Sequence, residues 1–343
     1  MPSNAILPRL IHFIENLKLP VLSLFRRNLF INIIFLLLFA VVLRGYFYYS
    51  SSPSMLDWSF TEILDLNTIL SNRIVQITLS IILIFVQGLL LSRYIIQHRL
   101  SRVVSVIPGA IFILFSCTVL EPESFSVILL ANLFFILSIG SLFKIYKKYK
   151  PVGTIFNSGF YLGIATIFYT HYFIYFIAII MGLLNLRRLN LKELLQMVSG
   201  FLCVYFMTIV FLFYNDNLAI LSSHLSIGFN LPNFDFTEPA RLIKPILLIL
   251  TLLTFIFFQN TLRKKKKFDA IKKIELTFWF LFLGLFTFLF VNDYNDSHLM
   301  ILSAPVSIIG GLIMEAKDKS VLKEVLFMSL IAAYFLLFFY FKS

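Results

Sequence analysis

The positive charges of this chain lie in alternate gaps between long apolar stretches. Eleven stretches are long enough to cross a bilayer, at about residues 29–47, 74–92, 103–120, 125–143, 152–170, 172–186, 195–214, 243–259, 276–291, 299–314 and 325–341. With the N-terminus in the cytoplasm, all but five of the 29 Lys and Arg residues fall on the inner side, and most of the 17 acids fall outside. This positive-inside bias predicts an all-α, polytopic transmembrane helix bundle of about 11 spans, with the C-terminus outside.

The composition excludes an ordinary soluble domain. Apolar residues make up 59% of the chain and charged residues only 13%, whereas soluble domains carry about 25% charge. The net charge of +12 does not indicate a nucleic-acid partner, because the basic residues form short clusters at span ends, such as the run from Lys264 to Lys267 in an inner linker. Clusters of this kind anchor the topology and face lipid phosphates, so membrane lipids are the expected partners.

The chain divides into two regions. Residues 1–28 alternate apolar and charged side chains at near-helical spacing, which predicts an amphipathic interfacial helix on the cytoplasmic face. Residues 29–343 form a single integral membrane domain. In its first outer loop, residues 48–73, Ser59 and Glu62 have the spacing of a capping box before an apolar stripe. This predicts a short interfacial helix on the outer leaflet.

Four acids on the outer side are candidate catalytic residues. Asp57 precedes the capping box and Asp65 lies on the polar side of the apolar stripe, whereas Glu121 and Glu123 share a short loop between two spans. A structural interpretation competes with each: loop acids can simply be solvated, and Glu123 can favour the free N–H groups of a first helical turn. Glu121 lacks that explanation, because it lies at the negative end of its own helix.

Basic residues on the outer side are exceptions to the positive-inside rule. Arg44 lies about a turn below the outer end of the first span, Arg73 begins the second, and Arg241 with Lys244 begins the eighth. A long basic side chain at this depth either snorkels to lipid headgroups or clamps a lipid-linked phosphate. These four residues are therefore the candidate phosphate-binding residues.

Three histidines, His171, His224 and His298, also fall outside, and we take His171 and His298 as further outer-face candidates. The histidines have no fixed spacing between them, so no metal site is predicted. Cys117 and Cys203 fall inside predicted spans, where a thiol is usually a small packing residue. This excludes a disulfide framework and a Cys-based metal site.

The order of these parts resembles the membrane-embedded glycosyltransferases of the GT-C superfamily, which take a sugar from a polyprenyl phosphate on the outer side of the membrane. In that superfamily an acid follows the first span, an interfacial helix comes next, and a second acid lies between spans 3 and 4. Asp57, with Asp65 as a rival, matches the first position, and Glu121 or Glu123 matches the second.

Two other resemblances concern the residue pattern and the composition of the chain. Residues 131–184, which include Gly159-Phe160-Tyr161-Leu162-Gly163, are similar to the same superfamily and to O-antigen polymerases. As a whole, the Phe- and Ile-rich chain resembles a functionally uncharacterised family of multi-span inner-membrane proteins from Bacteroidota. These resemblances imply a multi-pass protein of the bacterial inner membrane, with its outer side in the periplasm.

The GT-C resemblance implies a single displacement at the anomeric carbon. Asp57 would be the general base on the acceptor, Arg44 and Arg73 would stabilise the departing lipid phosphate, and Glu121 would orient the acceptor or hold a divalent cation. No other cofactor is implied. The chain departs from the family in two respects: paired acids do not follow the first span, and no periplasmic domain binds an acceptor.

Two other functions stay open. The chain could be a non-enzymatic inner-membrane subunit that packs against partners in a cell-envelope assembly, such as a secretion or gliding-motility complex. It could also transport a small molecule or a lipid. The spans carry no charge near their middle, which argues against an ion-driven transporter. Their mid-span polar residues, Gln87, Asn132 and Asn157, are expected to form interhelical hydrogen bonds.

Overall fold

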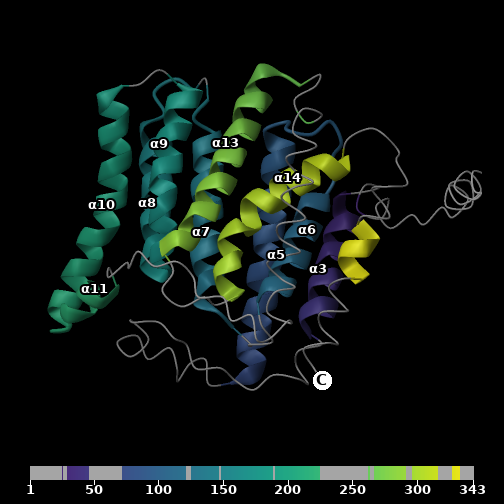
Figure 1. Cartoon of the computed structure of the whole chain (residues 1–343), viewed down its shortest axis with the longest axis horizontal. Helices are drawn as coiled ribbons and strands as arrows, with labels where there is room; N and C mark the ends of the chain where they lie inside the picture. Colours follow the sequence, from purple (N-terminus) through teal and green to yellow (C-terminus); the bar gives the residue numbers. More distant parts are fainter. Residues whose placement is uncertain are drawn as a thin grey trace, which may run out of the picture.

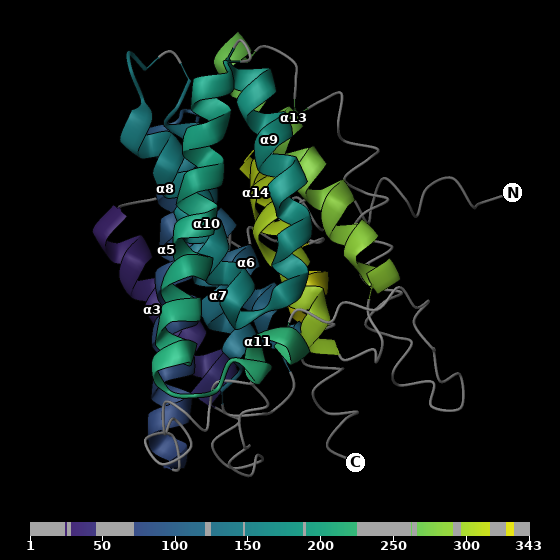
Figure 2. The same cartoon turned by 90° about the vertical axis from the view of Figure 1, so that its left-hand side faces the viewer.

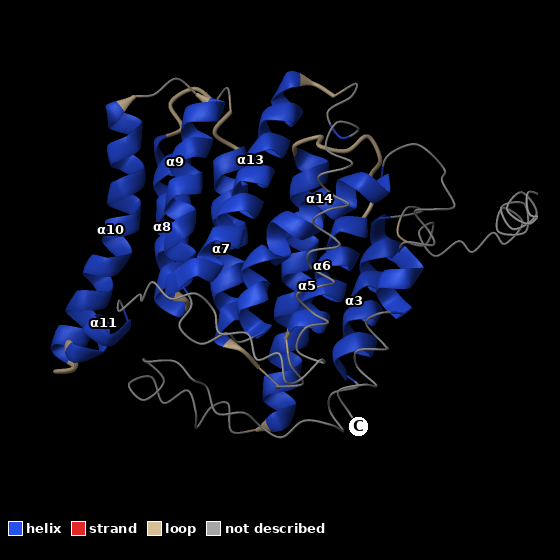
Figure 3. Cartoon of the chain, viewed as in Figure 1, coloured by secondary structure: helices blue, strands red, loops and turns tan. Residues whose placement is uncertain are grey.

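Helices form all of the regular structure in the described part of the computed structural model (Figure 3). The structure describes residues 25, 29–45, 72–120, 125–146, 148–187, 190–224, 262, 266–290, 296–315 and 327–332. No strand occurs within these ranges, so the predicted all-α class is confirmed there. The two predicted interfacial helices, in residues 1–28 and 48–73, lie outside the described residues except for residues 25, 72 and 73.

The helices follow the predicted spans in order. They are α3 (Leu29–Gly45), α5 (Arg73–Gln97), α6 (Ile107–Val119), α7 (Val127–Phe143), α8 (Val152–Phe168), α9 (Tyr175–Leu186), α10 (Leu191–Tyr214), α11 (Ala219–His224), α13 (Phe268–Phe286) and α14 (Ser303–Glu315). In the part of the chain that the structure describes, three short 3-10 segments precede or follow them: η2 (Thr170–Ile174), η3 (Thr287–Phe290) and η4 (Asp296–Leu302).

Within the described ranges, three helical segments are long and apolar enough to cross a membrane. They are Arg73–Gln97 with 25 residues, Leu191–Tyr214 with 24, and Ser297–Glu315, formed by most of η4 together with α14, with 19. Shorter apolar helices occupy the predicted spans around them. These features are those of a helical membrane protein, whereas the number of spans and the side of each terminus remain predictions.

Helix α13 begins well before the predicted start of its span. Residues 268–275 were expected to belong to an inner linker, but α13 begins at Phe268. Asp269 in its first turn is an acid at the positive end of the helix dipole, which favours this start. The helical start carries Lys272 and Lys273 into the bundle, and Lys273 is 3% exposed.

The helices share one apolar core and run mostly side by side (Figures 1 and 2). The start of α5 and the end of α10 lie at the lower edge of Figure 1, which the predicted topology places outside; we call this the outer end and the opposite one the inner end. Helix α14 crosses the bundle at a slant and is almost entirely buried. Helix α10 stands at one flank and packs on α8.

Glycines allow α8 and α10 to approach at backbone distance. A Cβ atom on Gly159 of α8 would lie 2.1 Å from the carbonyl oxygen of Met197, and one on Gly200 of α10 would lie 2.3 Å from that of Phe156. Both distances are far below a van der Waals contact. The Gly159 to Gly163 stretch is therefore one side of a close helix crossing, of the kind that small residues permit in membranes.

Two exposed tyrosines at opposite ends of the bundle test the predicted topology. Tyr149 precedes α8 and is 86% exposed, and Tyr214 ends α10 and is 87% exposed. In a chain with Cys117 and Cys203 replaced by Ser, we expect Tyr214→Cys to react with an impermeant thiol reagent in intact cells. Tyr149→Cys should react only after permeabilisation. Labelling of both positions in intact cells would contradict the assignment of inner and outer ends.

Candidate functional site

The described residues include four of the ten candidate site residues. Those outside the described residues are Asp57, Asp65, Glu121, Glu123, Arg241 and Lys244. Those described are Arg44, Arg73, His171 and His298. All four lie at the outer end, as the predicted topology requires.

Arg44 lies inside the bundle. It occupies the last turn of α3, is 1% exposed, and is among the largest fully buried side chains. Its charge is near enough to act on the thiol of Cys117 in α6. The Arg44 side chain is thus enclosed by protein, and its role, snorkelling or phosphate binding, stays a prediction.

Arg73 begins α5 at the same end of the molecule. The preceding residue, Asn72, caps the helix, with its Oδ1 atom accepting from the backbone N–H of Ile74 at 3.0 Å. The Arg73 side chain is half-buried. Helices α3 and α5 pack against each other, so the two arginines lie at the outer ends of neighbouring helices.

His171 and His298 come together, although 126 residues separate them in the chain. Their ring centroids are 5.0 Å apart at an interplanar angle of 84°. His298 of η4 is 1% exposed. The Phe288 ring lies edge-on to His298 at 4.8 Å, and the Tyr169 ring lies 5.8 Å away. We call Tyr169, His171, Thr287, Phe288 and His298 the outer histidine cluster.

Hydrogen bonds fix the protonation pattern of His298. The Thr287 hydroxyl donates to the Gly284 carbonyl oxygen at 2.6 Å, so its oxygen accepts from the Nε2–H group of His298 at 3.0 Å. The Nδ1 atom of His298 then accepts from the Tyr169 hydroxyl at 2.7 Å. Both ring nitrogens are used, so this histidine holds the end of α8 against the end of α13. In this arrangement both nitrogens are engaged in structural hydrogen bonds, and a functional role for His298 stays a prediction.

A chain of polar side chains continues from this cluster into the bundle. Tyr172 donates to Asn132 Oδ1 at 3.1 Å, Asn132 donates to Gln87 Oε1 at 2.8 Å, and Gln87 donates to the Leu129 carbonyl oxygen at 2.9 Å. The chain links η2, α7 and α5. Interhelical hydrogen bonding by Gln87 and Asn132 is thus confirmed, whereas Asn157 lies on an exposed face of α8.

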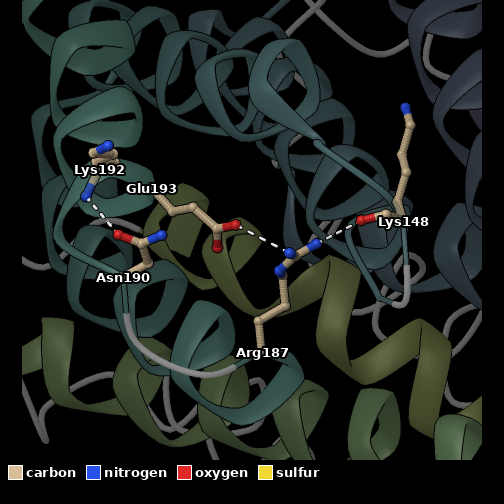
Figure 4. Close-up of polar contacts among 5 residues, drawn as sticks. All are labelled: Lys148, Arg187, Asn190, Lys192 and Glu193. Atoms are coloured by element: carbon tan, nitrogen blue, oxygen red, sulfur yellow. Dashed lines mark hydrogen bonds and ion pairs between the residues drawn. The ribbon is translucent and has the colours of Figure 1, made fainter.

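Polar contacts at the inner end join two connections between helices (Figure 4). Arg187 pairs with Glu193 of α10 at 3.1 Å and donates to the Lys148 carbonyl oxygen at 2.6 Å. Asn190 caps α10 by accepting from the backbone N–H of Lys192 at 3.1 Å. Arg187 therefore ties the α7–α8 connection to the α9–α10 connection.

The described residues hold no cluster suited to a metal ion. Among them, no three His, Cys, Asp or Glu side chains lie together in a way that could hold one. A divalent cation at the outer acids stays an expectation of the resemblance.

Sequence reasoning missed Tyr169 and Thr287, the two partners of His298. Tyr169 lies two residues before His171. This closeness in sequence was the only indication that Tyr169 could belong to a polar cluster. Thr287 gave none, because its role depends on how α13 packs.

Comparison with known proteins adds no relative: no family model, curated protein or solved structure matches the chain. The function must therefore be argued from the chain itself.

Proposed function

We propose that this protein is a multi-pass protein of the bacterial inner membrane that acts on a lipid-linked sugar or polyprenyl phosphate at the periplasmic face. One observation carries the proposal: Arg44, at the outer end of α3, is 1% exposed. A charge inside a membrane domain is costly, and residues of this kind commonly mark a path for ions or substrates. A guanidinium is well suited to a phosphate, because its planar fork binds two oxygens at once.

Most of the candidate residues have a specific role in this proposal. Arg44 would stabilise the negative charge that develops on the departing lipid phosphate, with Arg73 as a second cation on the neighbouring helix. Asp57 or Asp65 would be the general base for the acceptor hydroxyl, and Glu121 or Glu123 would orient the acceptor. The outer histidine cluster would form a rigid wall beside them, because the two nitrogens of His298 are already hydrogen-bonded.

Ligand-induced stabilisation of the purified protein tests the role of Arg44. We expect polyprenyl phosphate to raise the melting temperature of the wild type, and the uncharged polyprenol to leave it unchanged. Hydrogen bonds to a charged group contribute about 1.5–3 kcal/mol, so Arg44→Gln should weaken phosphate binding by roughly tenfold to a hundredfold. Arg44→Lys keeps the positive charge but loses the planar guanidinium that binds two oxygens, so it should bind polyprenyl phosphate with intermediate affinity.

Arg93→Gln is the matched control, because Arg93 is an exposed arginine near the inner end of α5. It should bind polyprenyl phosphate as the wild type does. Equal stabilisation of the wild type and Arg44→Gln would contradict the proposal, as would equal stabilisation by the phosphate and the alcohol. Melting of each variant without ligand separates lost binding from lost folding.

The surface of α10 favours a second candidate function, that of a non-enzymatic subunit of an envelope complex. Helix α10 exposes large apolar side chains along its length, among them Leu202, Phe206 and Phe213, which are 57–69% exposed. Such a surface suits lipid or a partner helix equally. Stable co-purification of another membrane protein, lost in a Phe206→Ala, Phe213→Ala variant, together with no effect of polyprenyl phosphate, would favour this function.

A further inference from the structure

A polar cluster at the inner end joins three helices and is independent of the proposed outer-face function. His98 follows α5, Lys144 follows α7, and Asp269 and Lys273 belong to the first turns of α13. The Lys273 ammonium lies 3.2 Å from Nδ1 of His98 and 3.0 Å from Oδ1 of Asp269. Residues 175 positions apart therefore meet here through side chains.

The contact with Lys273 fixes the tautomer of His98. An ammonium can only donate, so Nδ1 accepts and the proton of the neutral ring is on Nε2. Burial and the nearby Lys273 charge lower the pKa of His98 to about 4, so the ring is neutral at physiological pH. His98 thus presents an N–H donor on its Nε2 side.

This donor meets no hydrogen-bond acceptor among the described residues. The Nε2 atom of His98 is buried, and none of them pairs with it. Buried donors are nearly always satisfied in native proteins, so an unsatisfied one indicates a missing acceptor. The Phe143 ring lies edge-on to the imidazole, with centroids 5.6 Å apart, and is the alternative that the protein itself offers.

The surroundings favour a negatively charged acceptor. Lys144 is exposed and close enough for its charge to lower the pKa of His98 further. Asp269 offsets one of the positive charges through its ion pair with Lys273. Lys272 adds another cation, which lies 5.9 Å from the Tyr146 ring centroid. Tyrosine and lysine at a helix end are typical of the headgroup layer, where phosphate is the abundant anion.

We propose that the inner ends of α5, α7 and α13 bind a phosphate group, with the Nε2–H of His98 donating to a phosphate oxygen and Lys144 and Lys273 supplying positive charge. The phosphate can belong to an anionic lipid headgroup of the inner leaflet or to a free phosphate anion. Both sources present the same oxygens to the same donors. Lysine binds such groups as a point charge, without a fixed geometry.

The test uses the full chain in micelles of dodecyl maltoside, a detergent without phosphate, in a phosphate-free buffer. Phosphatidylglycerol and inorganic phosphate are added separately, and the melting temperature and the lipids retained in native mass spectrometry are measured. We expect the wild type to be stabilised by one of the two. His98→Phe, which keeps a ring against Phe143 but removes the N–H, should lose that stabilisation and any retained anionic lipid.

Two further variants keep the test decisive if His98→Phe folds poorly. Lys144→Gln removes an exposed charge without disturbing the core, and should weaken phosphate binding several-fold. Arg93→Gln removes another exposed charge at the inner end and should bind as the wild type does. Stabilisation by phosphatidylglycerol alone identifies a lipid headgroup, and stabilisation by inorganic phosphate identifies a free anion. No stabilisation by either, or equal binding by Lys144→Gln and the wild type, would overturn the proposal.

Discussion

Replacement of Gly200 with leucine is expected to separate α10 from α8 and to destabilise the protein severely. A Cβ atom at this position would lie 2.3 Å from the backbone oxygen of Phe156, and backbone of a helix cannot move aside as a side chain does. Overpacking of a well-packed site commonly costs about 1–3 kcal/mol and occasionally more. Here the whole crossing must open, so we expect about 3 kcal/mol or more. This loss of stability can be measured by thermal unfolding in detergent and by the protein level in membranes.

The separation caused by Gly200→Leu should also break contacts elsewhere between α8 and α10. The Tyr205 hydroxyl of α10 donates to Thr166 Oγ1 of α8 at 3.0 Å, and this bond depends on the close approach. Gly153→Ala is the matched control, because a Cβ atom there meets nothing within 4 Å. It should be neutral or slightly stabilising, since alanine is the better helix former. A Gly200→Leu protein as stable as Gly153→Ala would show that α8 and α10 do not cross at this point.

Replacement of His298 with leucine is expected to have the second largest effect. The change leaves the Tyr169 hydroxyl without its acceptor and removes the donor to Thr287. An unsatisfied buried polar group costs about 1–3 kcal/mol, and the ring contacts with Phe288 and His171 are lost as well. The free energy of unfolding should therefore fall by about 2–4 kcal/mol.

A double-mutant cycle with Tyr169→Phe isolates the hydrogen bond. Tyr169→Phe removes only the hydroxyl, so the loss on His298→Leu should be smaller in that background than in the wild type. His298→Gln keeps a donor and an acceptor and should recover part of the stability. Strict additivity of Tyr169→Phe and His298→Leu would contradict the contact between the two side chains.

The order of the helices could be predicted from the sequence because it depends on local properties. Apolar length and alternating charge placed α5 and α10 close to their observed positions. The start of α13 was missed because Lys272 and Lys273 resemble a solvated basic linker. Their helical state is favoured by Asp269 in the first turn of α13 and by the contact of Lys273 with His98, which only the packed bundle reveals.

The candidate site could be predicted only in part, for a related reason. His171 and His298 were selected because they fall on the outer side, yet nothing in the sequence indicates that their rings meet. For Arg44 the sequence left both snorkelling and phosphate binding open. It could not show that the side chain is enclosed, because burial depends on α5 and α6 packing beside α3.

Photo-crosslinking tests most directly the claim that the outer end of the bundle binds a lipid-linked phosphate. A polyprenyl phosphate that carries a diazirine close to the phosphate would be activated on membranes that contain the protein, and the labelled peptides identified by mass spectrometry. We predict labelling at the outer ends of α3 and α6, around Arg44 and Cys117, and loss of that labelling in Arg44→Gln. Labelling confined to the exposed face of α10, or labelling around Arg44 that persists in Arg44→Gln, would contradict the account.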